Sequence, residues 1–570
     1  MKMNFKYIFS AVVVSVMATA CIGDLDTTPL DDRTVTSESA YGAEEAGYVQ
    51  GLTKVYAQFA SNNTKDLIVD DGGSSELIRT FWSTQEITTD ACKVGWGNDS
   101  WAQDLNRNTW TAQHNHMIYS VYVRTLQGVA YANEYLRQTE DSRLELRGVS
   151  DDLKAKIAGF RAETRFLRAY FYWMALDTFG SVPFSTENSP FGGGYNPPQA
   201  SRADIFNFCV EELEALAAEG SDMPAAQANY PRADKGSCLG LLARLYINGK
   251  VYTGTESNAA GKTWSQLAKD TCERIYGLGK YSICPDYAAL FRGDNGENVQ
   301  ARNEFLFAVA YDGIKTKSYG GTTFLTLAST ASDDCGKQPW RLNGVNGGWG
   351  GIRVPYEYVE KYFAPTDIDY TYDPGYATTT QELYTRNNGY KVTDKRGSMF
   401  YILKREQSMK DHLYDFLYGW TCLKFNSVPH DKTIEEYASV AGTATNADVD
   451  FPMIRLGEIH LIYAEACMTA GGSAAEQIKA LADRAGIKAE TNVTIDWLVA
   501  ERARELMWEG HRRTDLVRYG KYTSKDFLWP YKGGDDYAGK GLDATRNLFA
   551  IPATERASNP DLKQNPGYEE

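Results

Sequence analysis

Six of the twelve tryptophans lie in two segments that are rich in turn-forming residues. The first segment carries Trp82, Trp96, Trp101 and Trp110, and the second carries Trp340 and Trp349. A sugar ring offers apolar C–H patches and a rim of hydroxyls. A site for it therefore needs an aromatic platform with fixed amide, carboxylate or guanidinium partners. Carbohydrate binding is the chemistry that these residue types favour.

We predict ten contact residues in these two segments and upstream of the second. Trp96 and Trp101 are the expected platforms, with Asp90, Asn98 and Asp99 as partners for sugar hydroxyls. The second segment and the stretch before it add Tyr311, Trp340, Arg341, Trp349 and Arg353. Trp82 and Trp110 border regular elements and are expected to pack instead. For each predicted contact, the alternative is that the side chain pins a long loop to the body.

A second group of residues could perform acid/base chemistry. Glu501, Glu505 and Glu509 recur at helical spacing, and His511 and Asp515 follow closely. Like charges on one helix face repel each other unless basic groups interleave, so an ion-pair network is the favoured interpretation. The sequence contains no nucleophile elbow, HExxH motif or phosphate loop. Because an acidic chain offers many carboxylate pairs, a glycoside hydrolase stays open as an alternative.

The cysteines do not suggest a metal centre. Eight of them follow Cys21, and none forms a CxxC pair or a Cys/His cluster with zinc spacing. Cys238 and Cys467 lie in helical apolar patterns, which predicts buried free thiols. The sequence implies no cofactor and leaves a structural calcium ion open.

Helices must position most of these groups. The apolar residues of 161–180 recur every three or four positions, and Gly180 with Pro183 supplies a stop signal. Similar patterns predict helices at 203–218, 231–247, 263–278, 454–469 and 495–519. Helix pairs of about 30–40 residues are typical of tetratricopeptide-like arrays. The predicted fold class is mainly α, with a tetratricopeptide-like helical-pair scaffold.

Residues 291–450 have a different character. Their helical periodicity fades, while glycine, asparagine, aspartate and threonine become more frequent. Short β-like runs occur at 305–309 and 399–403. We therefore expect a loop-rich insertion with small sheets, packed on the helical body.

The N-terminus has the pattern of an export signal. Lys2 and Lys6 precede an apolar run too short to span a bilayer, and Ala18 and Ala20 provide small residues for cleavage. Cys21 follows directly, which favours a lipidated mature N-terminus over a free secreted protein. The predicted divisions are a lipoprotein signal at 1–20, a lipidated tether at 21–40, a helical region at 41–290, the insertion at 291–450, and a helical region with a tail at 451–570.

The charge balance excludes one class of partner. The formal net charge is −15, and without residues 1–20 it is −17, from 57 basic and 74 acidic residues. Nucleic-acid binding needs a basic face, so we expect no nucleic-acid partner. An acidic body is not drawn to an anionic membrane surface, so the lipid on Cys21 must hold it there.

Five sequence blocks occur in order from the lipid anchor to the C-terminus. They are CIGDLDTTP at 21–29, RAETRFLRAY at 161–170, FPMIRLGEI at 451–459, ERAREL with EGHRRTDL at 501–516, and IPATE with QNPGY at 551–568. In this order, the blocks resemble the SusD/RagB-like outer-membrane lipoproteins of Bacteroidetes glycan-uptake systems.

That resemblance implies several properties of the chain. They are a tetratricopeptide-containing α-helical scaffold, capture of an oligo- or polysaccharide at the cell surface, and delivery to a SusC-like TonB-dependent transporter in the outer membrane. The resemblance also implies that loops in the two tryptophan-bearing regions help to build the glycan face. The RagB-like branch is associated with peptide uptake, and helical repeats often bind protein, so peptide binding is a further alternative.

Overall fold

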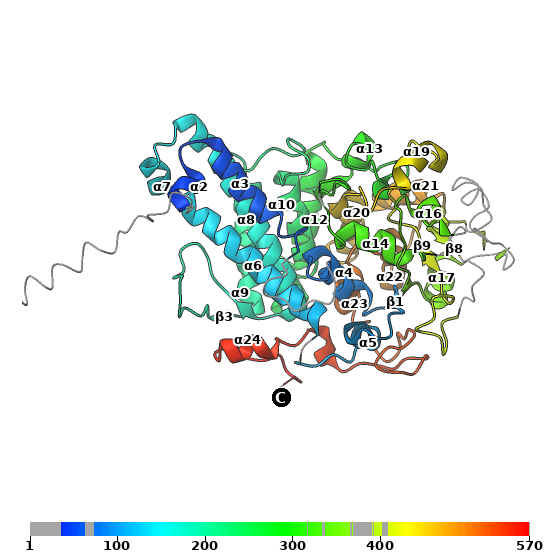
Figure 1. Ribbon diagram of the computed structural model, residues 1–570. Coiled ribbons are helices and arrows are strands. Elements are labelled where there is room, and N and C mark those ends of the chain that lie inside the picture. Colours follow the sequence, from blue (N-terminus) through cyan, green and yellow to red (C-terminus); the bar gives the residue numbers. More distant parts are fainter. Residues whose placement is uncertain are drawn as a thin grey trace, which may run out of the picture.

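The computed structural model describes residues 36–62, 73–113, 115–315, 317–332, 337–364, 393–400 and 408–568, with the backbone of 367–368, 390–391 and 401 (Figure 1). The predicted signal at 1–20, Cys21 and most of the predicted tether lie outside the described residues. Within the described residues, none of the helices combines the length and the apolar character needed to cross a membrane.

Helices dominate the described chain, as predicted. The first half contains α2 (Ser37–Tyr41), α3 (Glu45–Tyr56), α4 (Leu77–Glu86), α5 (Ser100–Arg107), α6 (His116–Gln138), α7 (Asp141–Leu146), α8 (Asp151–Phe179), α9 (Arg202–Ala217), α10 (Lys235–Ile247), α11 (Gly249–Thr253) and α12 (Trp264–Gly277). The insertion contains the shorter α13 (Val299–Arg302), α14 (Gly321–Ser329), α16 (Trp340–Asn343), α17 (Tyr356–Phe363) and α19 (Ile434–Ala441), and the C-terminal region contains α20 (Leu456–Ala470), α21 (Ala475–Ala485), α22 (Ile495–Glu505), α23 (Arg512–Arg518) and α24 (Ala553–Ser558). Single 3-10 turns are η1 (Ala288–Phe291), η4 (Lys395–Met399) and η5 (Ala544–Asn547).

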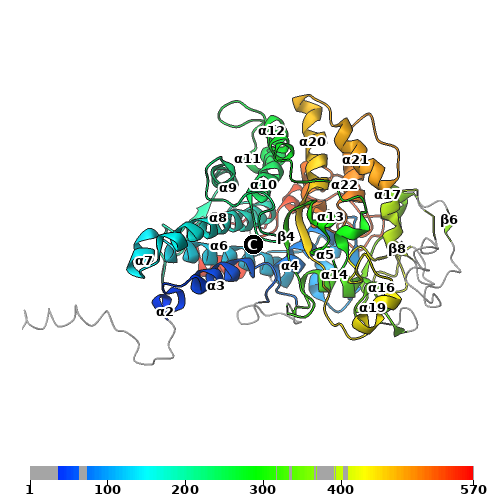
Figure 2. The same cartoon turned by 90° about the horizontal axis from the view of Figure 1, so that it is seen from above.

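The long helix α8 shows how local sequence defines these elements. Ser150 caps its N-terminus by accepting a hydrogen bond from the amide of Leu153, and Gly180 ends it at a φ of 75°. Almost every side chain from Phe160 onward is buried, because other elements cover α8 on all sides. Contacts run from α6 to α8, from α8 to α9, from α9 to α10, from α10 to α12 and from α12 to α20. Figures 1 and 2 show this succession of adjacent helices, which fits the predicted helical-pair scaffold.

Two predicted helices differ most from the structure: the helix predicted at 161–180 begins earlier, at Asp151, and the other is wrong in its continuity. The pattern at 495–519 predicts a single helix, but the structure has α22 and α23 with a break between them. Trp508 and Gly510 in the break have positive φ values of 62° and 78°, which a right-handed helix does not allow. Apolar residues recur at helical spacing on both sides of the break, so the sequence pattern alone does not show the turn.

The sheets are small and antiparallel, and each has two strands. The described strands are β1 (Lys93–Val94), β2 (Val182–Pro183), β3 (Gln199–Ala200), β4 (Phe305–Val309), β5 (Ile352–Arg353), β6 (Asp367–Ile368), β7 (Tyr390–Lys391), β8 (Phe400–Tyr401), β9 (Thr421–Cys422) and β10 (Phe451–Arg455). β4 confirms the predicted strand at 305–309 and pairs with β10. β8 covers part of the predicted run at 399–403, of which 402–403 lie outside the described residues.

The core runs through α4, whose ten residues are all buried. This helix packs against α6, α14 and α23, which come from the N-terminal, central and C-terminal parts of the chain. The indole nitrogen of Trp82 on α4 donates a 2.9 Å hydrogen bond to the carbonyl of Trp508. Trp82 is fully buried, as expected for a packing residue, and so is Trp110. One continuous core therefore joins regions that the sequence separates.

Candidate functional site

The two tryptophan-bearing segments meet in space. β1 and β5 pair antiparallel, with Lys93 opposite Arg353 and Val94 opposite Ile352. The pairing continues beyond the strands, where the amide of Gly95 donates a 2.6 Å hydrogen bond to the carbonyl of Gly351. The structure thus brings together the segments at 90–101 and 349–353, which the sequence analysis placed in one site.

Trp96 is half-buried and held at its edges. Its ring lies edge-on to the rings of Trp101 and Phe324, with centroid distances of 6.1 Å in both cases. Gly351 has a φ of +99°, and a side-chain carbon there would overlap the Trp96 indole. Only glycine combines this backbone conformation with such a close approach. The indole is therefore a fixed platform whose outer part reaches solvent.

Two predicted polar partners stand beside this platform. Asn98 is exposed, and Asp99 is half-buried at the N-cap position of α5. The carboxylate of Asp99 makes no hydrogen bond that caps α5. Both side chains lie close to the Trp96 platform in the chain, and both are at least partly exposed.

Trp349 forms a second aromatic pair. Its ring lies 5.8 Å from that of Tyr319 at an interplanar angle of 65°, and Tyr319 is 50% exposed. The amide of Trp349 donates a 2.8 Å hydrogen bond to the carbonyl of Leu327 on α14. α14 also carries Phe324, the ring beneath Trp96. One buried helix therefore supports both platforms.

The residues at 409–418 border the same region, and the sequence analysis missed them. A β-carbon on Gly97 would lie 3.0 Å from the Tyr414 ring, and one on Gly95 would lie 3.0 Å from the Phe416 ring. Tyr414 is 42% exposed, and its hydroxyl accepts a 2.6 Å hydrogen bond from Arg107. The alternation of aromatic side chains at Tyr414, Phe416 and Tyr418 was the signal that could have identified this stretch.

We call the surface formed by the exposed parts of these side chains the aromatic face. Its members are Trp96, Asn98, Asp99, Tyr319, Trp349 and Tyr414.

Asp90 lies behind the aromatic face and not on it. It is buried, and its carboxylate accepts hydrogen bonds of 2.7 Å and 2.8 Å from the guanidinium of Arg512 and one of 2.9 Å from the hydroxyl of Tyr362. Burial by itself would raise the pKa of Asp90, but the charge of Arg512 outweighs it and holds that pKa below its usual value. Both oxygens are engaged, which makes Asp90 a structural anion.

Three other predicted contacts are also buried. Trp101 is 3% exposed and packs behind Trp96. Arg353 is 1% exposed and donates a 3.1 Å hydrogen bond to the carbonyl of Phe416. Tyr311 is 5% exposed and donates to a buried carboxylate described below. The sequence pattern does not distinguish these supporting positions from the exposed ones, because depth depends on the packing of distant segments.

Trp340 and Arg341 belong to a different cluster. Trp340 is half-buried against the small apolar cluster of Val428, Ile434 and Ala441, which includes residues of α19. The Arg341 guanidinium lies 5.0 Å from the centre of the Trp340 ring. Trp96 and Trp349 pack instead against the main hydrophobic core.

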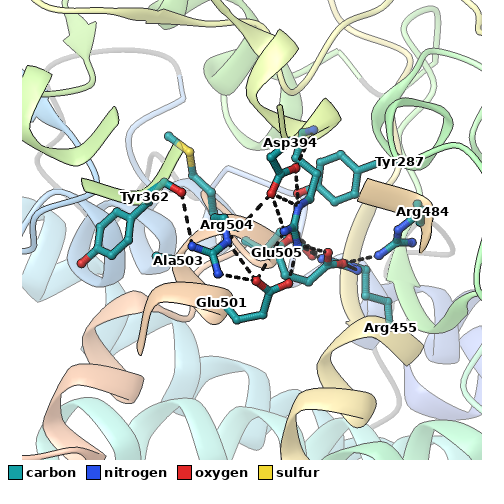
Figure 3. Close-up of polar contacts among 12 residues, drawn as sticks. Tyr287, Tyr362, Asp394, Arg455, Arg484, Glu501, Ala503, Arg504 and Glu505 are labelled. Carbon is teal, nitrogen blue, oxygen red and sulfur yellow. Dashed lines mark hydrogen bonds and ion pairs between the residues drawn. The ribbon is translucent and has the colours of Figure 1, made fainter. Parts of the chain in front are cut away.

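The carboxylates on α22 form the predicted ion-pair network (Figure 3). Glu505 accepts hydrogen bonds from Arg396 at 2.8 Å and from Arg455 at 2.5 Å, and also pairs with Arg484. Glu501 accepts a 2.8 Å hydrogen bond from the same Arg396. Burial would raise the pKa of Glu505, but the three arginines outweigh it and hold the pKa well below its usual range. The prediction of an ion-pair network is confirmed.

His511 is not poised for proton transfer at neutral pH. It is buried, and burial lowers its pKa to about 4. Among the described residues, histidine, cysteine, aspartate and glutamate side chains form no group of three that could hold a metal ion. Cys238 is a buried free thiol, as predicted, whereas Cys467 is half-buried because its end of α20 approaches solvent.

Comparisons with known proteins agree with this architecture. The model of the SusD family matches residues 303–568. The starch-binding protein SusD of Bacteroides thetaiotaomicron is 31% identical over an alignment of 586 positions, which covers 99% of each chain.

Solved structures also match almost the whole fold. A SusD superfamily protein from Parabacteroides distasonis superposes with a TM-score of 0.65 at 17% identity, covering 94% of this chain and 100% of that one. Surface glycan-binding protein A from Bacteroides thetaiotaomicron, in complex with laminarihexaose, superposes with a TM-score of 0.64 at 19% identity, covering 91% and 99%.

Proposed function

This chain belongs to the SusD family, and on that premise we propose that it captures an oligo- or polysaccharide at the cell surface and passes it to a SusC-like TonB-dependent transporter. It acts as a binding protein and not as an enzyme, in keeping with its family. The carboxylates that could have suggested acid/base catalysis are buried in arginine pairs.

The aromatic face is the observation that carries the proposal. Trp96 and Trp349 are half-buried platforms supported by α14, and Tyr319 and Tyr414 extend the aromatic surface beside them. Asn98 and Asp99 supply polar groups at its edge. Rigid aromatic rings with few polar neighbours suit the apolar faces and hydroxyl rim of a sugar chain.

A starch-type α-glucan is the first ligand to test. The relative at 31% identity is named as starch-binding, and it matches this chain from end to end. The structural relative bound to laminarihexaose is only 19% identical and supports the fold alone. A β-1,3-glucan is therefore a comparison ligand.

The test is affinity electrophoresis of the soluble chain that lacks residues 1–21, in gels containing amylopectin, laminarin, inulin or xylan. We expect one polysaccharide to retard the protein without being shortened. Trp497, a half-buried tryptophan on α22 outside the aromatic face, provides the control variant Trp497→Ala. Retardation that survives Trp96→Ala combined with Trp349→Ala would refute the aromatic face as the site.

The membrane anchor is the second part of the proposal. Cys21 follows the predicted export signal and would carry the lipid that holds the body on the outer membrane; its exposure at the outer surface is part of the proposal. Cys21→Ser should release the protein from the membrane fraction and leave its glycan affinity in solution unchanged. Retention of this variant in the membrane, in cells without the transporter, would contradict the lipid anchor.

The transporter partnership needs its own test. Co-purification of the lipidated chain with a TonB-dependent transporter from outer membranes is the expected result. Peptide uptake, which is the RagB-like alternative, predicts that the protein binds peptide mixtures and that Trp96→Ala does not weaken this binding.

If the protein releases shorter sugars from the polysaccharide that retards it, the hydrolase alternative is supported instead.

A further inference from the structure

Glu76 is a fully buried residue at the N-cap position of α4, yet its side chain does not cap that helix. Its two oxygens accept hydrogen bonds from hydroxyl groups instead. Tyr311 donates to Oε1 at 2.5 Å, and Ser318 donates to Oε2. A buried carboxylate is costly unless its oxygens have partners. The carboxylate thus ties α4 to the segment that leads into α14.

That segment, 318–321, is closely fitted to Glu76. The Ser318 hydroxyl also accepts a 2.9 Å hydrogen bond from the amide of Gly320. A side-chain carbon at Gly320 would overlap the Glu76 carboxylate, and one at Gly321, where φ is +49°, would overlap the Tyr311 hydroxyl. These contacts leave the backbone on both sides of residue 319 little freedom.

Residue 319 is the tyrosine of the aromatic face. Its ring lies beside that of Trp349, with centroids 5.8 Å apart, while its backbone passes over the start of α4. The carbonyl of Tyr319 accepts a long hydrogen bond of 3.5 Å from Arg79 on α4. Contacts with α4 therefore fix the backbone that carries this exposed ring.

We propose that Glu76 is a positioning residue for glycan binding, which holds the segment 318–321 so that Tyr319 and Trp349 form one surface. Glu76 is buried and does not touch the ligand. This inference rests on the proposed function, because it concerns the same aromatic face.

The charge state of Glu76 determines how strongly its carboxylate holds the segment 318–321. Burial raises the pKa of Glu76 to about 7, although its two hydroxyl partners and the charges of Arg79 and Arg124 oppose the shift. Arg79 lies on α4 and Arg124 on α6. Asp450, ahead of β10, faces the same cluster: burial raises its pKa to about 6, and it accepts a 2.9 Å hydrogen bond from the amide of Tyr311, whose own pKa burial raises well above its usual range.

The charged carboxylate accepts a hydrogen bond from each of the two hydroxyls. A proton on one oxygen turns that oxygen into a donor, so the facing hydroxyl must accept instead and the charge-assisted hydrogen bond is lost. Because Ser318 already accepts a hydrogen bond from the amide of Gly320, protonation weakens the contact between Glu76 and the segment. We therefore expect the affinity for glycan to rise as the pH increases from 6 to 8.

The experiment compares wild type with Glu76→Gln, using maltoheptaose as the first probe and laminarihexaose as the second. The control is Glu86→Gln on the same helix. Glu86 is also buried, its pKa is also raised to about 7 by burial, and it accepts hydrogen bonds from the amides of Gly510 and His511. A general effect of a buried carboxylate would thus appear in both variants.

Two measurements are made on each protein. Hydrogen exchange at one pH reports the protection of the amides in 318–324, and calorimetry reports the dissociation constant at pH 6 and pH 8. For wild type we expect binding about three- to tenfold tighter at pH 8, the size of one ordinary intramolecular hydrogen bond. Glu76→Gln should expose the segment to exchange and bind weakly at both pH values, whereas Glu86→Gln should keep the wild-type profile.

Ser318→Ala provides a second variant if Glu76→Gln does not fold. It removes a hydrogen bond that favours the charged carboxylate, so the pH at which the affinity changes should move upward. A role in stability alone would weaken binding without moving this midpoint.

The outcomes separate the two proposals. Unchanged exchange in 318–324 of Glu76→Gln overturns the positioning role, whether or not any glycan binds. Increased exchange with wild-type affinity and pH profile also overturns it, because Tyr319 then needs no positioning. If exchange increases in Glu76→Gln but the wild type binds neither probe, the result counts against the glucan-binding function. It would still show that Glu76 holds the segment 318–321 in place.

Discussion

The backbone amide of Gly95 and the carbonyl of Gly351 are joined by a 2.6 Å hydrogen bond, which extends a sheet of only two residues per strand. Gly351 then passes under the edge of the Trp96 indole, where a β-carbon would overlap the ring. The first platform of the aromatic face is therefore fixed by the backbone of the segment that carries the second platform.

Gly351→Ala should reduce glycan affinity by about tenfold, because displacement of Trp96 removes a central aromatic contact. The matched control is Gly192→Ala, where φ is +108° and no atom lies within 4 Å of the added carbon. Both variants impose backbone strain of about 1–2 kcal/mol, and only the first moves an aromatic ring. Calorimetric titration and thermal melting of both proteins check this, and equal affinities would contradict it.

Replacement of the tryptophans one at a time should divide them into two groups. Trp96→Ala and Trp349→Ala should each weaken glycan binding about tenfold or more, as expected for central aromatic contacts. Trp340→Ala should leave the affinity within about twofold and lower the melting temperature, since its ring packs beside α19. If Trp340→Ala loses glycan affinity, the binding site also includes Trp340 and Arg341.

Asp90→Asn tests whether Asp90 supports the structure or binds the ligand. Because Arg512 holds the pKa of Asp90 below its unfolded value of about 3.9, the pair stabilises the fold above that pH. The contribution is lost as the pH falls through the folded-state pKa. We expect the variant to lose about 3 kcal/mol of unfolding free energy at pH 7, and the difference from wild type to shrink below pH 4.

Urea unfolding at several pH values measures this difference for Asp90→Asn. Asp535→Asn is the control, because its exposed pair with Arg107 should contribute less than about 1 kcal/mol. The glycan affinity of folded Asp90→Asn should equal that of wild type. If Asp90→Asn binds glycan more weakly and is as stable as wild type, Asp90 contributes to the ligand site and not to the fold.

Arg455→Met tests the buried network of Figure 3. Arg455 pairs with Glu304, Glu505 and Glu509, all fully or almost fully buried. The variant takes one cation from all three carboxylates, each of which keeps another basic partner, and leaves the buried network with an excess of negative charge. We expect a loss of about 3–5 kcal/mol in unfolding free energy. Arg143→Met, which breaks an exposed pair with Glu38, should cost less than about 1 kcal/mol. Chemical denaturation measures both unfolding free energies. If Arg455→Met and Arg143→Met lose similar amounts, the buried network contributes no more stability than an exposed ion pair.

Local patterns were sufficient to predict much of the scaffold. The apolar period at 161–180 and the terminal Gly180 lie within one stretch of sequence, whereas the start of α8 at Asp151 was not predicted. The ion-pair network was also predictable, because the closely spaced Glu501, Glu505 and Glu509 require basic partners. Glu509 joins it from the break after α22 and not from the same helix face. The break between α22 and α23 was not predictable, since it depends on positive φ values at Trp508 and Gly510 within a continuing apolar period.

The site was only partly predictable, for a physical reason. The residue types and glycine content of the two segments indicated an aromatic surface. A strand of two residues has no measurable period, so the pairing of β1 with β5 was not visible. The depth of Asp90 is determined by Arg512, 422 positions away in the chain. Exposure of a loop residue is a tertiary property, and sequence spacing does not determine it.

The complete burial of α4 has a consequence for biosynthesis. Translation makes this helix early, but its packing partner α23 is almost the last helix to leave the ribosome. A ten-residue helix is marginal in water without such packing. The aromatic face above α4 can therefore form only after nearly the whole chain has been made. On the proposed function, an unfinished chain binds no sugar, and capture begins only when the finished molecule has folded.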